Sequence, residues 1–247
     1  MNKSKSIAML SGAAIMALSL PSLAADTPLQ SLAQSVGGQL DSTLRTFLVL
    51  SILAVIPALL IGLTSFTRIV VVLALLRHAL GIPQTPPNSV LMTLAIFLTI
   101  FSMGPVIDDV SKHSLQPYMA KEITLDEAVV RAESPLKSFM VHQTRESDLK
   151  AVVEMARAPL PKSLAEVKFT HLATAFLLSE LKTAFQIGFV IFLPFLLIDI
   201  VVSAILMALG MIMLPPTTIS LPLKLLLFVL IDGWVLVSRS LMGSFWN

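Results

Sequence analysis

The sequence predicts an all-α integral membrane protein that carries a small helical insert outside the bilayer. Hydrophobic residues make up 55% of the chain, charged residues only 13%, and the mean hydropathy is +0.87. These values lie outside the range of ordinary soluble domains. Several apolar runs reach the length of about 20 residues that a membrane-spanning helix needs. In the polar part, apolar residues recur at helical spacing and form no strand pattern.

Composition also argues against several classes of function. The net charge of +2 comes from scattered Lys and Arg residues that form no stripe, so we expect no nucleic-acid partner. The absence of cysteine excludes disulfides, thiolate metal sites and a cysteine nucleophile. The four histidines lie far apart, and no metalloprotease, P-loop or serine-hydrolase motif occurs. We therefore expect no enzymatic activity, no cofactor and no metal site.

Residues 1–24 have the pattern of a secretory signal peptide. Lys3 and Lys5 form a basic start, an apolar stretch follows, Pro21 breaks it, and small residues precede cleavage after Ala24. An uncleaved first membrane helix is the alternative, although the apolar stretch is short for a span. A cleaved signal would place the mature N-terminus, the polar insert and the C-terminus outside the cytoplasm.

The segment after the signal, residues 25–107, is expected to form a first helical hairpin. Residues 46–76 carry one long apolar pattern, with Pro57 as the expected position of a kink and Gly81 as the expected C-cap. This helix is expected to be longer than a bilayer requires. A proline-rich turn follows, and residues 90–107 then return across the membrane.

Polar character begins at residue 108 and extends to Lys182, and we predict a helical periplasmic insert over residues 108–168. Within the insert, residues 128–141 and 146–156 show helical spacing. Four prolines are expected to cut the segment into short helices: Pro117, Pro135, Pro159 and Pro161.

The C-terminal segment, residues 169–247, contains two apolar blocks over residues 183–214 and 221–241, with a proline pair as the turn between them. Five charged residues lie in or beside these blocks: Glu180, Lys182, Asp199, Lys224 and Asp232. A charge at the centre of a membrane helix costs about 2.5 to 3.5 kcal/mol on insertion scales, so these side chains are expected to meet protein or water. We predict roles in assembly or in a pore. An ion pair or helix cap within one subunit remains the alternative for each.

Charged residues within apolar helices are also typical of two other functions. Asp199 and Asp232 could form an intramembrane aspartyl protease pair, but Ile231 replaces the glycine that such proteases carry before the second Asp. A proton-coupled or small-solute carrier could use Glu180, Lys182 and Asp199 as a relay at a broken helix. Such a carrier commonly shows two similar halves, and no internal similarity is visible here. A passive scaffold is a third class that the residues leave open.

Two stretches carry a resemblance to a known family. Residues 175–189 read AFLLSELKTAFQIGF, and residues 222–234 read PLKLLLFVLIDGW. Both resemble the signature motifs of the FliP family of flagellar and type III secretion export-gate proteins. The stretch over residues 64–83 and the Gly104–Pro105 pair are also similar to the family, so the resemblance covers nearly the whole chain. The signal peptide favours the flagellar branch.

The resemblance implies a subunit of a protein-conducting gate in the bacterial inner membrane, within the flagellar basal body. Family members form tilted helical hairpins and assemble as about five copies with FliQ and FliR type subunits. Export substrates and FlhA and FlhB type components are the further partners that it implies.

The resemblance also implies a role for the methionines near the second hairpin tip. The family places a methionine-rich gasket there, which seals the pore. The corresponding residues here are Met207, Met211, Ile212 and Met213. Unbranched methionine side chains can repack as a pore changes shape. From the residues alone, core packing at a hairpin end is the alternative.

Overall fold

The computed structural model describes residues 42–159, 161, 166–211 and 213–246. These residues form helices and connecting turns, with no strand among them. The all-α prediction is therefore confirmed. The chain divides into two compact units, residues 1–54 and 55–247. Helix α3 (Ser42–Leu63) begins in the first unit and ends in the second, while the expected signal peptide lies outside the described residues.

One helix stands out by its length and composition. Helix α10 (Phe169–Ala208) has 40 residues and could cross a membrane by itself. It continues through Pro194 without a break. Three further helix pairs are apolar enough to span a membrane if each bent pair counts as one span. Among the described residues this gives between one and four candidate spans.

The first of these pairs corrects the expected long helix over residues 46–76. Helix α3 ends at Leu63, and α4 (Phe66–Ala79) starts after a break. At the break, the Thr64 hydroxyl accepts a hydrogen bond from the amide of Phe66, and the Thr67 hydroxyl donates to a carbonyl of α3. Threonine side chains can thus replace helix hydrogen bonds with local ones.

The end of α4 and the following turn agree with the sequence expectations. Gly81 lies just beyond the helix with φ +79°, a left-handed conformation that glycine adopts without steric cost. Its amide donates to the carbonyl of His78. A turn then leads to α5 (Asn88–Ser102), as expected.

The return run over residues 90–107 is bent as well. Helix α5 ends before Met103, and α6 (Gly104–Val110) opens a second arm that continues to Met119. The two arms meet at 62°. Pro105 lies in the first turn of α6, where a proline has no intrahelical donor to lose.

The insert is helical, but its divisions differ from the prediction. After α6 come a π-helical turn (Ser111–Leu115), α7 (Gln116–Met119), α8 (Leu125–Gln143) and α9 (Glu146–Met155). Helix α8 runs through Pro135, so the expected break there is wrong. A capping box between Thr124 and Glu127 fixes its start, and buried Phe139 and Met140 hold its second half.

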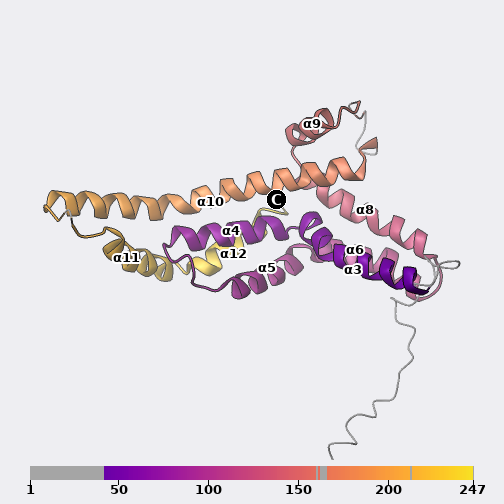
Figure 1. Ribbon diagram of the computed structural model, residues 1–247, viewed down its shortest axis with the longest axis horizontal. Helices are drawn as coiled ribbons and strands as arrows, with labels where there is room; N and C mark the ends of the chain where they lie inside the picture. Colours follow the sequence, from indigo (N-terminus) through magenta and orange to yellow (C-terminus); the bar gives the residue numbers. More distant parts are fainter. Residues whose placement is uncertain (1–41, 160, 162–165, 212, 247) are drawn as a thin grey trace, which may run out of the picture. The chain divides into compact units, whose positions relative to one another are not determined.

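The core of the second unit lies where α4 packs along α10 (Figure 1). Ile69, Leu73 and Leu76 of α4 are buried, as are Leu172 and Phe176 of α10. Helices α8 and α9 also contact α10, while α5 packs against α4. This arrangement brings residues from distant parts of the sequence around the start of α4.

The second signature stretch spans the junction between α11 (Thr217–Leu230) and α12 (Gly233–Gly243), which meet at 63°. Asp232 forms the elbow with φ 51°, a conformation that Asp tolerates better than most residues. A Cβ atom added at Gly233 would lie 2.1 Å from a ring carbon of Phe228. The absence of a side chain at Gly233 therefore permits the close elbow.

Replacing Gly233 with alanine should destabilise the protein by about 1–3 kcal/mol, because the rigid Phe228 ring must move. Gly243 of the same helix is the matched control, since an added Cβ there meets nothing within 4 Å. Gly243→Ala should change stability by less than about 0.5 kcal/mol. Thermal unfolding in detergent compares the two. Equal midpoints would show that the elbow is not tightly packed.

Candidate functional site

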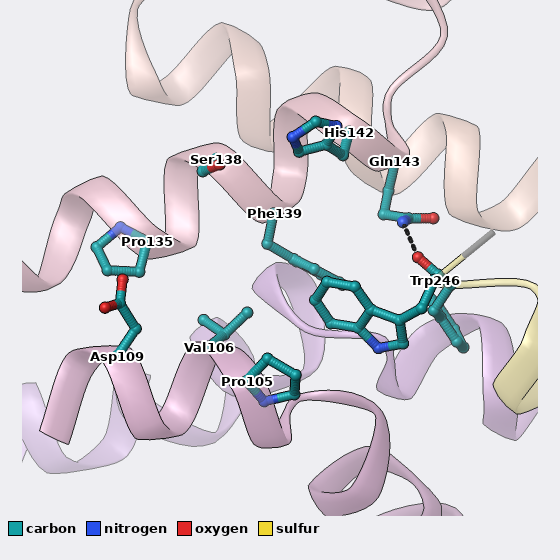
Figure 2. A pocket seen from close by; sticks show the side chains of 10 residues that line it. Pro105, Val106, Asp109, Pro135, Ser138, Phe139, His142, Gln143 and Trp246 are labelled. Atoms are coloured by element: carbon teal, nitrogen blue, oxygen red, sulfur yellow. Dashed lines mark hydrogen bonds between the residues drawn. The ribbon is translucent and has the colours of Figure 1, made fainter. Parts of the chain in front are cut away.

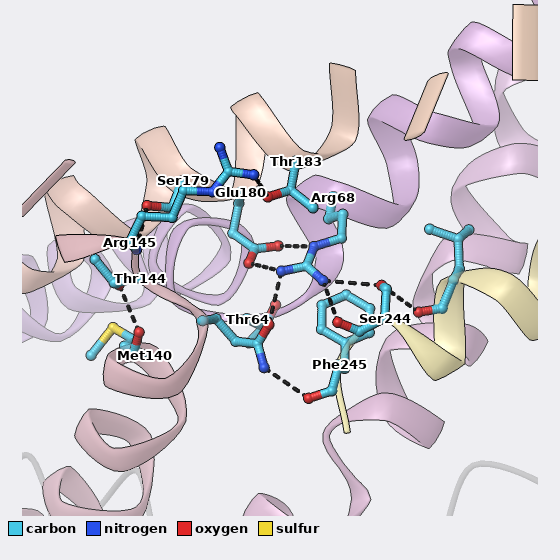
Figure 3. A network of polar contacts seen from close by, with 12 residues as sticks. Thr64, Arg68, Met140, Thr144, Arg145, Ser179, Glu180, Thr183, Ser244 and Phe245 are labelled. Atoms are coloured by element: carbon cyan, nitrogen blue, oxygen red, sulfur yellow. Dashed lines mark hydrogen bonds and ion pairs between the residues drawn. The ribbon is translucent and has the colours of Figure 1, made fainter. Parts of the chain in front are cut away.

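Arg68, near the start of α4, is the centre of a buried polar network that we call the arginine hub (Figure 3). Its Nε donates to Glu180 Oε2 at 2.9 Å, and its Nη2 donates to Glu180 Oε1 at 2.5 Å. Glu180 is fully buried on α10. Arg68 and Glu180 therefore form a bidentate ion pair, which a planar guanidinium can make and an ammonium group cannot.

The remaining donors of Arg68 bind two other elements. Nη2 also donates to Gln143 Oε1 of α8 at 2.9 Å. Nη1 donates to both the carbonyl and the hydroxyl oxygen of Ser244, each at 3.0 Å. Since a guanidinium has five N–H groups, these five hydrogen bonds saturate it. The Phe245 ring completes the enclosure, with its centroid 4.0 Å from the guanidinium carbon.

A second polar cluster attaches the α8–α9 linker to α10 at Ser179, the residue that directly precedes Glu180. The Ser179 hydroxyl donates to Asp148 at 2.7 Å and accepts from the Arg145 amide at 3.1 Å. The Arg145 guanidinium also donates to Thr183 of α10 (Figure 3) and to Gln186 of the same helix. The insert is thus attached to the long helix by side-chain hydrogen bonds as well as by packing.

Lys182 belongs to this cluster but is held loosely. Its Nζ lies 3.8 Å from an oxygen of Asp148, and about half of the Lys182 side chain is exposed. Exposed ion pairs of this kind contribute at most about 1 kcal/mol. Glu180 and Lys182 therefore differ in environment although only one residue lies between them.

A second ion pair joins α10 to α11, with its lysine buried and its aspartate partly exposed. Lys224 Nζ donates to Asp199 Oδ2 at 2.6 Å and to the Ala79 carbonyl at 3.3 Å. The Lys224 side chain is 8% exposed. The pair thus connects α10, α11 and the end of α4.

Asp232 differs from the other four predicted charges. It is exposed at the α11–α12 elbow, and its side chain makes no capping hydrogen bond to α12. The structure thus gives Glu180, Lys182, Asp199 and Lys224 partners within the chain, and places Asp232 where its backbone conformation shapes the elbow. Whether any of them lines a pore stays a prediction.

The methionine tip, which we define as residues 207–213, joins α10 to α11. Met213 is 95% exposed, and Met207 and Met211 are also exposed. Gly210 turns the chain with φ +74°. The described methionines therefore do not fill the core of their own chain, while Ile212 lies outside the described residues.

Sequence reasoning missed Arg68, although it identified the partner carboxylate. A signal was present, because Arg68 is a lone charge followed by eight apolar residues and Glu180 is a lone acid within another apolar run. Two opposite charges in separate apolar runs are candidates for one buried pair. Gln143 and Ser244 carried no such signal, since neither side chain is charged.

A cavity of about 570 Å³ lies beside the hub, between α6, α8 and the residues after α12 (Figure 2). Pro105, Val106 and Phe139 supply apolar walls, while Asp109 and His142 supply polar ones. Among the residues that the structure describes, no group of three or more His, Asp or Glu side chains could hold a metal ion. The arrangement as a whole satisfies buried charges and joins distant helices.

Comparison with known proteins identifies the family. The FliP family model matches residues 49–241. The flagellar biosynthetic protein FliP of Bacillus subtilis strain 168 is 50% identical over 205 residues, which cover 83% of this chain and 93% of that protein. Proteins with the same name from Pectobacterium carotovorum and Aquifex aeolicus are 49% and 47% identical, and the matches cover 80% and 88% of their lengths. The chain belongs to the FliP family.

Proposed function

We propose that the chain is a core subunit of the flagellar type III protein export gate. As a FliP-family member with apolar helices, it is a membrane protein of flagellar biosynthesis and export. The finer proposal is that several copies, about five, assemble with FliQ and FliR type subunits around a protein-conducting pore. The observation that carries it is the family match over residues 49–241.

Two features of the chain support an assembled state. Arg68 and Glu180 are buried as a pair whose guanidinium donors all have acceptors, which lets these charges remain in an apolar environment. Large apolar side chains are exposed along α10, among them Phe185, Phe189 and Leu197. Such a surface suits lipid or neighbouring subunits.

The methionine tip is proposed as the pore gasket. Its exposed apolar side chains would meet those of other copies and exclude water from a closed pore. The proposed topology places the N-terminus and the insert in the periplasm of the inner membrane, at the flagellar basal body. This topology depends on the predicted signal peptide over residues 1–24. Export substrates and FlhA and FlhB type components are the further partners proposed.

A proton-coupled or small-solute carrier is the rival. Its proposed relay residues bind different partners: Glu180 contacts Arg68, Lys182 contacts Asp148, and Asp199 contacts Lys224. A relay needs neighbouring groups that exchange protons, and these contacts give the carrier proposal no support.

Purification of the tagged full-length chain from flagellated cells tests the proposal. We expect a large membrane complex that contains several copies together with FliQ and FliR type proteins, measured by native mass spectrometry. Deletion of the gene should abolish secretion of flagellar proteins, and a plasmid copy should restore it. A stable monomer that transports a solute in liposomes would favour the carrier instead.

A further inference from the structure

The residues that follow α12 contact three separate parts of the chain. Ser244 accepts two hydrogen bonds from Arg68 of α4, and the Phe245 carbonyl accepts one from Gln143 Nε2 of α8 at 2.8 Å. The Trp246 indole N–H donates to the Ser102 carbonyl at the end of α5, also at 2.8 Å. Three consecutive residues thus bind α4, α5 and α8.

The Trp246 contact lies at the bend between α5 and α6. Carbonyls in the last turn of a helix have no intrahelical partner, so the Ser102 carbonyl is free to accept a bond from outside. The Trp246 ring also packs against Phe139 of α8, with centroids 6.1 Å apart. The indole therefore holds the end of α5 next to the insert helix.

Gln143 connects this contact to the arginine hub. Its amide oxygen accepts from Arg68. Its amide nitrogen donates to the Phe245 carbonyl, which is the dashed line that starts at Gln143 in Figure 2. One side chain of α8 thus binds both the guanidinium and the residue before Trp246. A change at the α5–α6 bend can reach the hub through residues 244–246 and Gln143.

We propose that Ser244, Phe245 and Trp246 act as a strap. The strap fixes the bend between α5 and α6 and couples these two helices to α8 and to the arginine hub. The strap binds the bend through the hydrogen bond from the Trp246 indole N–H to Ser102, and it binds the insert through the hydrogen bond from Gln143 to Phe245. In this role the strap sets the angle between α5 and α6, while each helix forms without it.

The bend angle can be measured directly, because the chain has no native cysteine. Spin labels are attached to Ile96→Cys on α5 and Lys112→Cys beyond α6, both exposed positions. Pulsed electron resonance then measures the distance distribution in the assembled membrane complex. Trp246→Phe removes the N–H and keeps an aromatic ring. Loss of one hydrogen bond should raise the population of other bend angles about fivefold, seen as a broader distribution.

Trp234→Phe is the matched control, because Trp234 packs against Phe228 at the other elbow. It should leave the distribution between labels 96 and 112 narrow. A distribution in Trp246→Phe as narrow as that of the control would overturn the proposal. Circular dichroism and complex size confirm that both variants remain folded and assembled.

A second measurement keeps the test independent of the labels. In the Trp234→Phe background Trp246 is the single tryptophan, so its fluorescence anisotropy reports the mobility of the strap. Gln143→Met should lower that anisotropy, because the bond to Phe245 is lost. Ser138→Ala, at an exposed position on the same helix, should leave the Trp246 anisotropy unchanged. Equal anisotropy in the two variants would contradict the coupling through Gln143.

Discussion

Replacement of Arg68 with lysine is expected to prevent assembly of the complex although the positive charge is kept. Lysine has three donors on a single nitrogen and cannot bind Glu180 in two places while also reaching Gln143 and Ser244. Breaking a buried ion pair costs about 3–5 kcal/mol, which is a large share of the stability of most proteins. Complex yield by size-exclusion chromatography and the thermal midpoint in detergent measure the effect.

Two variants show whether the loss comes from the buried pair itself. Arg68→Met combined with Glu180→Met should recover part of the stability, because no unpaired charge then remains buried. The double variant should remain less stable than the wild-type protein, since Gln143 and Ser244 still lack the donors of Arg68. Lys182→Met, in the half-exposed pair with Asp148, should cost less than about 1 kcal/mol. Wild-type yield and midpoint for Arg68→Lys would contradict a structural role for the hub.

Replacement of Met211, Ile212 and Met213 with alanine is expected to make the membrane leak ions while the complex still assembles. These positions lie at the tip between α10 and α11, away from the buried pairs that hold the helices. Shorter side chains would widen an apolar constriction and admit water, which removes the barrier to ions. Conductance of the purified complex in planar bilayers, together with ion leakage from cells, measures the effect.

Lys224→Met serves as the contrasting variant. It leaves the Asp199 carboxylate without its cation at the contact between α10 and α11, so assembly should fail before permeability changes. A triple alanine variant that assembles and stays impermeable would contradict the proposed gasket. A leaking Lys224→Met complex with normal yield would instead place that lysine at the pore.

Helix type and membrane character could be predicted because they depend on local composition. Apolar residues at helical spacing identified α8 and α9, and Gly81 and the proline pair at residues 215–216 marked true chain reversals. The two signature stretches identified the family for a similar reason, since each is a contiguous run of residues.

The three bends within apolar runs could not be read from the same pattern. At Met103 and Ile231 apolar residues lie at or beside the break, so hydropathy continues while the backbone turns. At Pro135 the sequence predicted a break, but α8 continues. The capping box before Pro135 and the buried residues after it stabilise the helix on both sides. Local sequence sets a preference, and packing against other helices decides whether a helix continues.

The sequence by itself determined that this chain is a helical membrane protein of a particular family and that its buried charges need partners. Only the tertiary structure decided which partners they find. Arg68 and Glu180 are 112 positions apart, and Arg68 and Ser244 are 176 apart. Hydropathy and helical periodicity act over a few turns, whereas a buried charge is satisfied by whichever donor or acceptor the folded chain brings within about 3 Å.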